Sequence, residues 1–351
     1  MPANHIVVIG ASAGGLQALT DLVEHIPAGV GDAFFVALHT NSEANSLLPE
    51  ILGRKAKIPV AFAQHGESIK AGTIAVAPPN QHLLVMKNRL ILNRGPKENG
   101  FRPAVDPLFR TAARAHGERV IGIILSGALD DGTYGLKMVK DHGGIAVVQD
   151  PDEATHPSMP LSALQIVHAD HVLRAADIGR LIAKLSSQSS EGVVPMGRRE
   201  EREPQDPGEH TGVEEMDRDF GPASGLTCPD CGGALWEITN GELTRYRCHV
   251  GHQYTTESLD AGHQQVVEGA LWSAVRVLEE HSDLRRRMAK RAEERGLEVV
   301  SSGFAESADE SERQANTIRQ LLFGREQPEP APASIKPETK NVRVKGKRRS
   351  A

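Results

Sequence analysis

The sequence predicts an α/β fold, in which a doubly wound, mostly parallel sheet carries helices on both faces. Two observations predict it. Apolar runs in the first half of the chain are continuous rather than alternating, as in strands that are buried on both faces. Amphipathic helical stretches separate these runs, and this alternation builds a parallel sheet. Aromatic residues are only 4% of the chain, so aliphatic side chains must supply most of the core.

The expected elements alternate along the first half of the chain. Strands are expected at residues 6–9, 33–38, 73–77, 90–92, 120–125 and 145–148, and helices at 16–26, 107–116 and 176–185. In the first of these helices, Leu19, Leu22 and Val23 recur at helical spacing. Such spacing places apolar side chains on one face, where they pack against a sheet.

Composition divides the chain into five expected parts. They are an α/β domain over 1–187, a disordered linker over 188–225, a small cysteine-containing module over 226–256, a helical segment over 257–323 and a disordered basic tail over 324–351. The linker is rich in Ser, Glu, Arg, Pro and Gly and has no apolar period. In the helical segment, apolar spacing predicts helices over 258–295 and 307–323, with Gly324 placed to end the second.

Charge and cysteine usage exclude several classes of protein. The chain has 351 residues with 40 Lys+Arg against 46 Asp+Glu, a net charge of -6, which argues against a nucleic-acid binder. No apolar run approaches the roughly 18 residues that span a bilayer, and no secretory segment opens the chain, so a membrane-spanning or exported protein is not expected. Three cysteines are too few for a disulfide scaffold, which favours the reducing cytoplasm.

A candidate nucleophile lies in the turn after the first expected strand. The segment from Gly10 to Gly14 reads Gly-Ala-Ser-Ala-Gly and leads into the first expected helix, so Ser12 has the strand, turn and helix context of a nucleophile turn. The helix N-terminus directs backbone N–H groups to the place where an oxyanion develops, and Ala13 is the expected donor. The alternative is that Ser12 only caps the helix.

A dinucleotide-binding turn is the main rival for this segment. That turn needs a second glycine where Ser12 stands, because the backbone must approach a pyrophosphate there. It also needs an acid at the end of the second strand, which here ends at His39. Both departures disfavour nucleotide binding.

His39 and a carboxylate complete a candidate catalytic triad. The carboxyl ends of parallel strands converge on one crevice, so His39 and the acidic turn after residues 120–125 are expected near Ser12. That turn contains Asp130 and Asp131, and position alone does not choose between them. In a triad, Ser attacks, His removes its proton, and the acid orients the imidazole. A structural histidine and an ordinary Asp-Asp-Gly turn are the alternatives.

Residues 6–185 resemble the catalytic domain of the CheB-type chemotaxis protein-glutamate methylesterases. The resemblance rests on the Ser12 turn, on His39, on Arg102-Pro-x-Val-Asp106-x-Leu-Phe, and on Leu-Ser-Gly-x-x-x-Asp131-Gly. It implies a carboxylic-ester hydrolase that demethylates glutamate γ-methyl esters on chemoreceptor-type proteins, and in some members deamidates glutamines. It assigns the nucleophile to Ser12, the base to His39 and the acid to Asp131, with no cofactor for catalysis.

The chain departs from the family pattern in three ways. Ala13 replaces the usual Thr, and Gly127-Ala-Leu129 replaces the usual Gly-Met-Gly before the acidic turn. With the first strand at residue 6, we expect no receiver domain ahead of the esterase, so a separate response regulator is a candidate partner beside the methylated receptor. The alternative function is a weakly active or non-catalytic signalling adaptor that binds partners through its zinc-ribbon and helical modules.

The cysteine segment predicts a structural metal site. Cys228 and Cys231 form a Cys-x-x-Cys pair, and Cys248 with His252 supplies the second pair of ligands across a hairpin. His252 is favoured over His249, which adjoins Cys248. A closed Cys3His set suits a structural Zn²⁺, because no position stays open for water. Reduced cysteines without metal, or a redox pair, are the alternatives.

Overall fold

The computed structural model describes residues 3–39, 46–189, 221–240 and 243–324. It divides into two compact units, Met1–Gln265 and Val266–Ala351. Most of the expected linker over 188–225, and all but the first residue of the expected tail over 324–351, lie outside the described residues.

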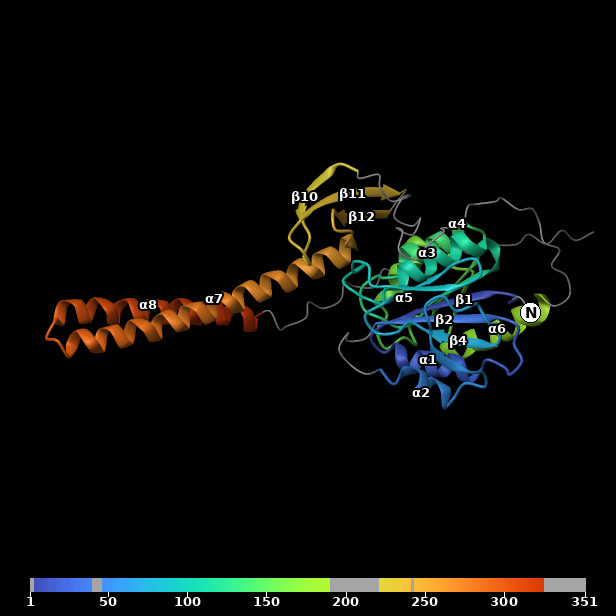
Figure 1. The fold of residues 1–351 in the computed structure, drawn as a ribbon, viewed down its shortest axis with the longest axis horizontal. Coiled ribbons are helices and arrows are strands. Elements are labelled where there is room, and N and C mark those ends of the chain that lie inside the picture. The colour runs from blue at the N-terminus through green and yellow to red at the C-terminus, as the bar shows by residue number, and fades with distance from the viewer. Residues whose placement is uncertain (1–2, 40–45, 190–220, 241–242, 325–351) are drawn as a thin grey trace, which may run out of the picture. The chain divides into compact units, whose positions relative to one another are not determined.

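A seven-stranded, entirely parallel sheet forms the centre of the first unit (Figure 1). Its strands, in spatial order, are β3 (Val60–Phe62), β4 (Thr73–Val76), β2 (Ala33–Leu38), β1 (Ile6–Ala11), β7 (Val120–Ile124), β8 (Ile145–Gln149) and β9 (His171–Leu173). The order reverses about β1, which lies between β2 and β7. The predicted doubly wound α/β fold is confirmed.

Helices cover both faces of this sheet, and each layer has its own core. One face carries α1 (Gly15–Glu24), α2 (Leu48–Gly53) and α6 (Ala175–Ser189), and the other carries α3 (Val105–His116), α4 (Thr133–Asp141) and α5 (Ser158–Ile166). Every residue of β1, β2 and β7 is buried. This burial explains why their sequences are continuously apolar, since both faces of each strand meet helices.

One expected strand lies outside the main sheet. Residues 90–92 do form a strand, β6 (Leu90–Asn93), but it pairs antiparallel with β5 (His82–Val85) in a separate ribbon. The reason is local, because the short turn between β5 and β6 closes with a hydrogen bond from the Met86 N–H to the Arg89 carbonyl. A turn this short joins antiparallel strands, whereas parallel neighbours need a long crossover.

A four-stranded antiparallel sheet forms the cysteine module. It consists of β10 (Ala223–Thr227), β11 (Ala234–Asn240), β12 (Leu243–Cys248) and β13 (Gln253–Thr255), paired in that order. Its buried apolar cluster is small and comprises Cys228, Leu235, Cys248, Tyr254 and Leu259. So few buried side chains make a metal cross-link a plausible source of stability.

Two long helices complete the described chain. Helix α7 (Thr256–Glu293) begins directly after β13, within two residues of the start expected for it, and α8 (Glu298–Phe323) begins nine residues before the expected residue 307. The segment missed in α8 holds Gly303 and serines, which weaken a helical pattern. In the second unit, α7 and α8 form a hairpin that buries Val275, Ala315 and Leu322. No helix in the described ranges combines the length and apolarity needed to cross a membrane.

Candidate active site

Three neighbouring strands end at the candidate site. Ser12 follows β1, His39 follows β2, and Asp131 lies in the turn after β7. Because these strands are parallel and adjacent, their carboxyl ends lie together at one edge of the sheet. Residues far apart in the chain therefore meet where the sequence predicts.

The three side chains form one hydrogen-bonded chain. His39 Nδ1 lies 3.0 Å from Ser12 Oγ, and His39 Nε2 lies 2.7 Å from Asp131 Oδ2. The His39 ring stacks on Phe101, with 3.7 Å between ring centroids. The His39 side chain is 4% exposed and that of Asp131 1%. The imidazole is thus fixed through both nitrogens and one face, with Nε2–H donating to the carboxylate and Nδ1 free to accept the Ser12 proton.

Asp131 is surrounded by donors. Its carboxylate accepts hydrogen bonds from the backbone N–H of Val105 at 2.7 Å, the N–H of Asp106 at 3.2 Å and the Asn99 amide at 2.8 Å, in addition to His39. Burial alone raises a carboxyl pKa, but the hydrogen bond and charge of His39, with these donors, hold the pKa of Asp131 below its usual range. Asp131 therefore keeps its negative charge in the site.

Two further carboxyl groups, those of Asp106 and Asp130, lie beside Asp131, and their pKa values are raised rather than lowered. Burial, reinforced by the charge of Asp131, raises the pKa of Asp106 to about 7. Burial also raises the pKa of Asp130 to about 8, although a hydrogen bond from Thr255 opposes that rise. Of the two acids in the turn, Asp131 bonds His39, whereas Asp130 Oδ1 accepts from Thr255 Oγ1 at 2.9 Å. The hydrogen bond to His39 is thus made by Asp131, the acid that the family resemblance assigns, and not by Asp130.

Close backbone packing shapes the turn that holds Ser12. The Ser12 N–H donates to the Ser126 carbonyl at 3.0 Å, so the turns after β1 and β7 are tied together. A Cβ on Gly127 would overlap Met159 Sδ and lie 2.9 Å from Ser12 Cβ, which leaves room only for glycine. Ala13 lies between Ser12 and the first residues of α1, and its carbonyl accepts Ser126 Oγ at 2.8 Å.

Sequence reasoning missed Asn99 and Phe101, which contact the triad directly. Asn99 bonds Asp131 and Phe101 stacks on His39. Both lie in a loop that pairs with no strand of the main sheet, so strand ends gave no signal for them. A nearby motif residue, Arg102, donates to Asn80 Oδ1 at 2.8 Å and to the Gly95 carbonyl at 2.7 Å.

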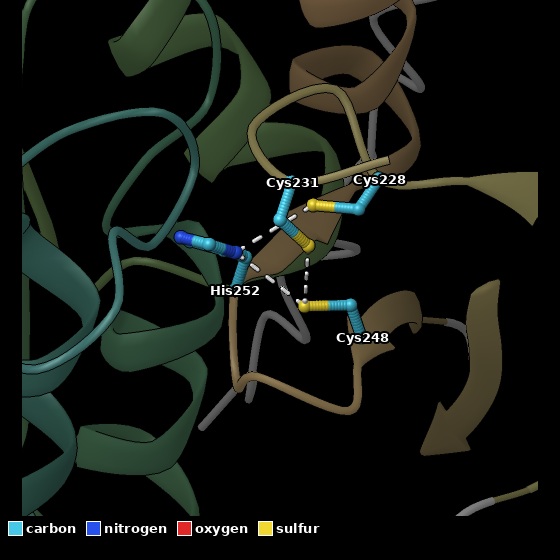
Figure 2. A group of neighbouring side chains, drawn as sticks. All are labelled: Cys228, Cys231, Cys248 and His252. Carbon is cyan, nitrogen blue, oxygen red and sulfur yellow. Dashed lines mark hydrogen bonds between the residues drawn. The ribbon is translucent and has the colours of Figure 1, made fainter. Parts of the chain in front are cut away.

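The four predicted metal ligands also come together (Figure 2). Their ligand atoms all lie within 4.8 Å of one another. Cys231 Sγ lies 3.7 Å from Cys248 Sγ, and His252 Nδ1 lies 3.6 Å from Cys228 Sγ and 3.4 Å from Cys248 Sγ. Zinc bonds of about 2.3 Å to sulfur and 2.05 Å to nitrogen give tetrahedral edges of about 3.8 and 3.6 Å. The residues fit a tetrahedral metal ion.

The site and the fold together define a class of protein. An open parallel α/β sheet that carries a hydrogen-bonded Ser, His and Asp at its carboxyl edge has the architecture of a serine hydrolase. A family model for the CheB methylesterase matches residues 7–182. The chain belongs to the CheB methylesterase family.

Individual relatives agree with this membership. The chain covers 96% of a Leptospira interrogans relative, with 37% identity over 186 residues. A protein-glutamate methylesterase/protein-glutamine glutaminase of Anaeromyxobacter dehalogenans is 33% identical over 181 residues, which are 52% of this chain and 53% of that protein. The crystal structure of the Thermotoga maritima CheB methylesterase catalytic domain has 31% identity and a TM-score of 0.50, over 52% of this chain and 98% of that one.

Proposed function

We propose that this protein hydrolyses glutamate γ-methyl esters on chemoreceptor-type signalling proteins through Ser12, His39 and Asp131. The single observation that carries the proposal is the hydrogen-bonded chain from Ser12 Oγ through His39 to Asp131. The relatives named protein-glutamate methylesterase/protein-glutamine glutaminase support both the ester substrate and a second activity, deamidation of protein glutamine.

The proposed reaction has two halves. Ser12 Oγ attacks the ester carbonyl carbon while its proton passes to His39 Nδ1, and the backbone N–H of Ala13 stabilises the oxyanion. The C–O bond to the methoxy group then breaks, His39 returns the proton to it, and methanol leaves an acyl-Ser12 intermediate. Water attacks this acyl group while its proton passes to His39; the acyl C–Oγ bond then breaks, His39 returns the proton to Ser12 Oγ, and the glutamate side chain is released as a carboxylate. With a glutamine substrate, ammonia leaves in place of methanol.

Asp131 has an electrostatic part in both halves. Its lowered pKa keeps it anionic, so it stabilises the imidazolium that forms at each proton transfer. Its bond to His39 Nε2 also fixes the tautomer in which Nδ1 lacks a proton and serves as the base.

The second part of the proposal is a structural Zn²⁺ bound by Cys228, Cys231, Cys248 and His252. Bond lengths for tetrahedral zinc reproduce the separations of these ligand atoms, and three cysteines with one histidine suit that ion. A closed set of four protein ligands leaves no place for a catalytic water, so the metal supplies no chemical step of ester hydrolysis.

The proposal also covers the location of the protein in the cell and the control of its activity. We place the protein in the cytoplasm, where reducing conditions keep its three cysteines out of disulfides and available to the metal. A separate response regulator is the proposed source of control. A purely non-catalytic adaptor would not need an imidazole that is fixed on both nitrogens, so the enzyme is favoured over that alternative.

The test is release of methanol from methylated receptor fragments by the purified protein. We expect turnover by the wild type and a loss of several orders of magnitude in Ser12→Ala, because loss of a triad nucleophile leaves little catalysis. Ser273→Ala, an exposed serine on α7 whose hydroxyl bonds only its own helix, is the matched control. Near-wild-type turnover in Ser12→Ala would refute the assignment.

A further inference from the structure

A buried polar contact joins the cysteine module to the catalytic acid. The residues involved lie on β12, β13 and the first turn of α7 in the module, and in loop 97–101 and the turn after β7 in the sheet domain. The family model matches residues 7–182, so it includes Asn99 and Asp131 and ends before the cysteine module begins.

The first turn of α7 supplies the donors. Thr255 and Ser258 form a reciprocal cap, in which the Ser258 N–H donates to Thr255 Oγ1 at 3.1 Å and the Thr255 N–H donates to Ser258 Oγ at 2.9 Å. The two hydroxyls then point out of the cap. Thr255 Oγ1 donates to Asp130 Oδ1 at 2.9 Å, and Ser258 Oγ donates to Asn99 Oδ1 at 3.1 Å.

Asn99 connects these donors to the triad. Its carbonyl oxygen accepts from the Thr255 N–H and from Ser258 Oγ, both at 3.1 Å. Its amide nitrogen donates to Asp131 Oδ1 at 2.8 Å and to Asp106 Oδ2 at 2.9 Å. All four hydrogen-bonding positions of the amide are used, and the side chain is buried. The module therefore determines which end of Asn99 faces the carboxylates.

The loop that carries Asn99 is held by the same module. Gln253 of β13 forms a parallel bridge to Glu98, with the Asn99 N–H donating to the Gln253 carbonyl at 2.7 Å. Glu98 makes a bidentate ion pair with Arg110 of α3 at 2.9 and 3.0 Å, and Arg245 of β12 lies 3.9 Å from it. Burial opposes ionisation of Glu98, but these guanidinium groups hold its pKa at about 2. The contact is thus continuous from β12 to the loop.

We propose that the cysteine module supports the active site structurally: Thr255 and Ser258 hold Asn99, and Asn99 positions Asp131 against His39. This inference rests on the proposed triad. Thr255, Ser258 and Asn99 are positioning residues, because none of them contacts Ser12 or His39 in the described residues. Loss of the Ser258 hydroxyl removes one of the two donors to the Asn99 oxygen, and loss of the Thr255 hydroxyl removes the contact of the first turn of α7 with Asp130. Either loss loosens Asn99 and, through it, the carboxylate that orients the imidazole. Displacements of about 1 Å in such a site cost up to a hundredfold in rate.

The experiment uses full-length variants. Ser258→Ala removes the hydroxyl that donates to Asn99, and Thr255→Val removes the hydroxyl that donates to Asp130 while keeping the backbone N–H that donates to Asn99. Two quantities are measured: kcat and KM for methanol release, and the labelling of Ser12 by a fluorophosphonate. We expect kcat per labelled Ser12, and the labelling rate, to fall about tenfold or more while KM changes less than twofold. The labelling end point counts folded sites, so partial unfolding does not imitate this result.

Thr255→Ser is the matched rescue, because it keeps the hydroxyl that Thr255→Val removes, and it should restore kcat to within about threefold of wild type. If Ser258→Ala lowers the labelling end point, Asn99→Asp replaces it. That variant keeps the shape of the side chain and exchanges the donor facing Asp131 for an acceptor.

The outcomes separate the two proposals. Wild-type kcat in folded Ser258→Ala and Thr255→Val, or in Asn99→Asp, overturns the positioning role and leaves the esterase intact. A wild type that neither labels at Ser12 nor releases methanol overturns the proposed function instead.

Discussion

At the scale of single residues, the candidate site distributes charge unequally among three adjacent acids. Asp131 has four donors around its carboxylate and stays anionic, whereas burial raises the pKa of Asp106 to about 7 and that of Asp130 to about 8. One carboxylate charge in the cluster is enough to stabilise the protonated His39, and a second carboxylate charge would be repelled by the first. Asp130, which is protonated at neutral pH, also accepts the hydrogen bond that Thr255 of the cysteine module donates.

Asp130 makes stability depend on pH. An aspartate has a pKa of about 3.9 in an unfolded chain, and Asp130 has about 8 when folded. Between these values the folded state binds more protons, so the free energy of unfolding should fall as pH rises from about 4 to about 8. Asp130→Asn has no proton to lose, and we expect it to flatten this fall and to be more stable than wild type at pH 8 by about 1 kcal/mol or more.

Urea unfolding of the two proteins at pH 5, 7 and 8 measures this difference. Asp141→Asn is the control, since that exposed carboxylate pairs only with Lys137 at the surface. Parallel stability curves for wild type and Asp130→Asn would show that Asp130 is ionised throughout.

At the scale of elements, the sequence predicts those site residues whose positions are determined by the ends of strands. Ser12, His39 and Asp131 each follow a continuous apolar run, and parallel strands must end together, so their convergence follows from periodicity and topology. Loop 97–101 follows no such rule. Its position depends on ion pairs of Glu98 with Arg110 and Arg245 and on a bridge to β13. The contacts with Arg245 and β13 span more than 100 residues of the chain and leave no periodic signal in the sequence.

The turn after β7 contains a strained residue. Leu129 has a φ of 61°, in the left-handed region that a side chain with a Cβ disfavours. We expect Leu129→Gly to raise the free energy of unfolding by about 1 kcal/mol, because glycine adopts this conformation without the steric penalty.

Chemical denaturation measures that gain. Gly53→Ala tests the method, since that glycine is the last residue of α2, an added Cβ would meet no side chain within 4 Å, and alanine has the higher helix propensity. A Leu129→Gly variant less stable than wild type would mean that packing of the leucine outweighs its backbone strain. Methanol release by the same variant shows whether the strain serves catalysis, which a fall in kcat with rising stability would indicate.

At the scale of the whole molecule, two parts with different sources of stability meet at the catalytic acid. The sheet domain has two extensive apolar cores, whereas the cysteine module buries only a handful of apolar side chains around its ligand cluster. His252 directly precedes β13, whose first residue, Gln253, bridges to loop 97–101, so the metal site and the contact with Asn99 are adjacent in the chain. Removal of the metal should therefore lower the reactivity of Ser12.

Metal removal is the prediction that tests this arrangement. Protein purified without added zinc should contain about one equivalent of Zn²⁺, because the module is too small to fold without a cross-link. A chelator should unfold the module, leave the far-ultraviolet signal of the sheet domain largely in place, and slow fluorophosphonate labelling of Ser12 about tenfold. Zinc should restore the rate, and Cys228→Ser should behave like the chelated wild type. Magnesium, which prefers oxygen ligands, should not restore it. Unchanged labelling in metal-free protein with an unfolded module would show that the esterase holds Asp131 by itself, and a metal-free module that stays folded would show that its cysteines bind no structural ion.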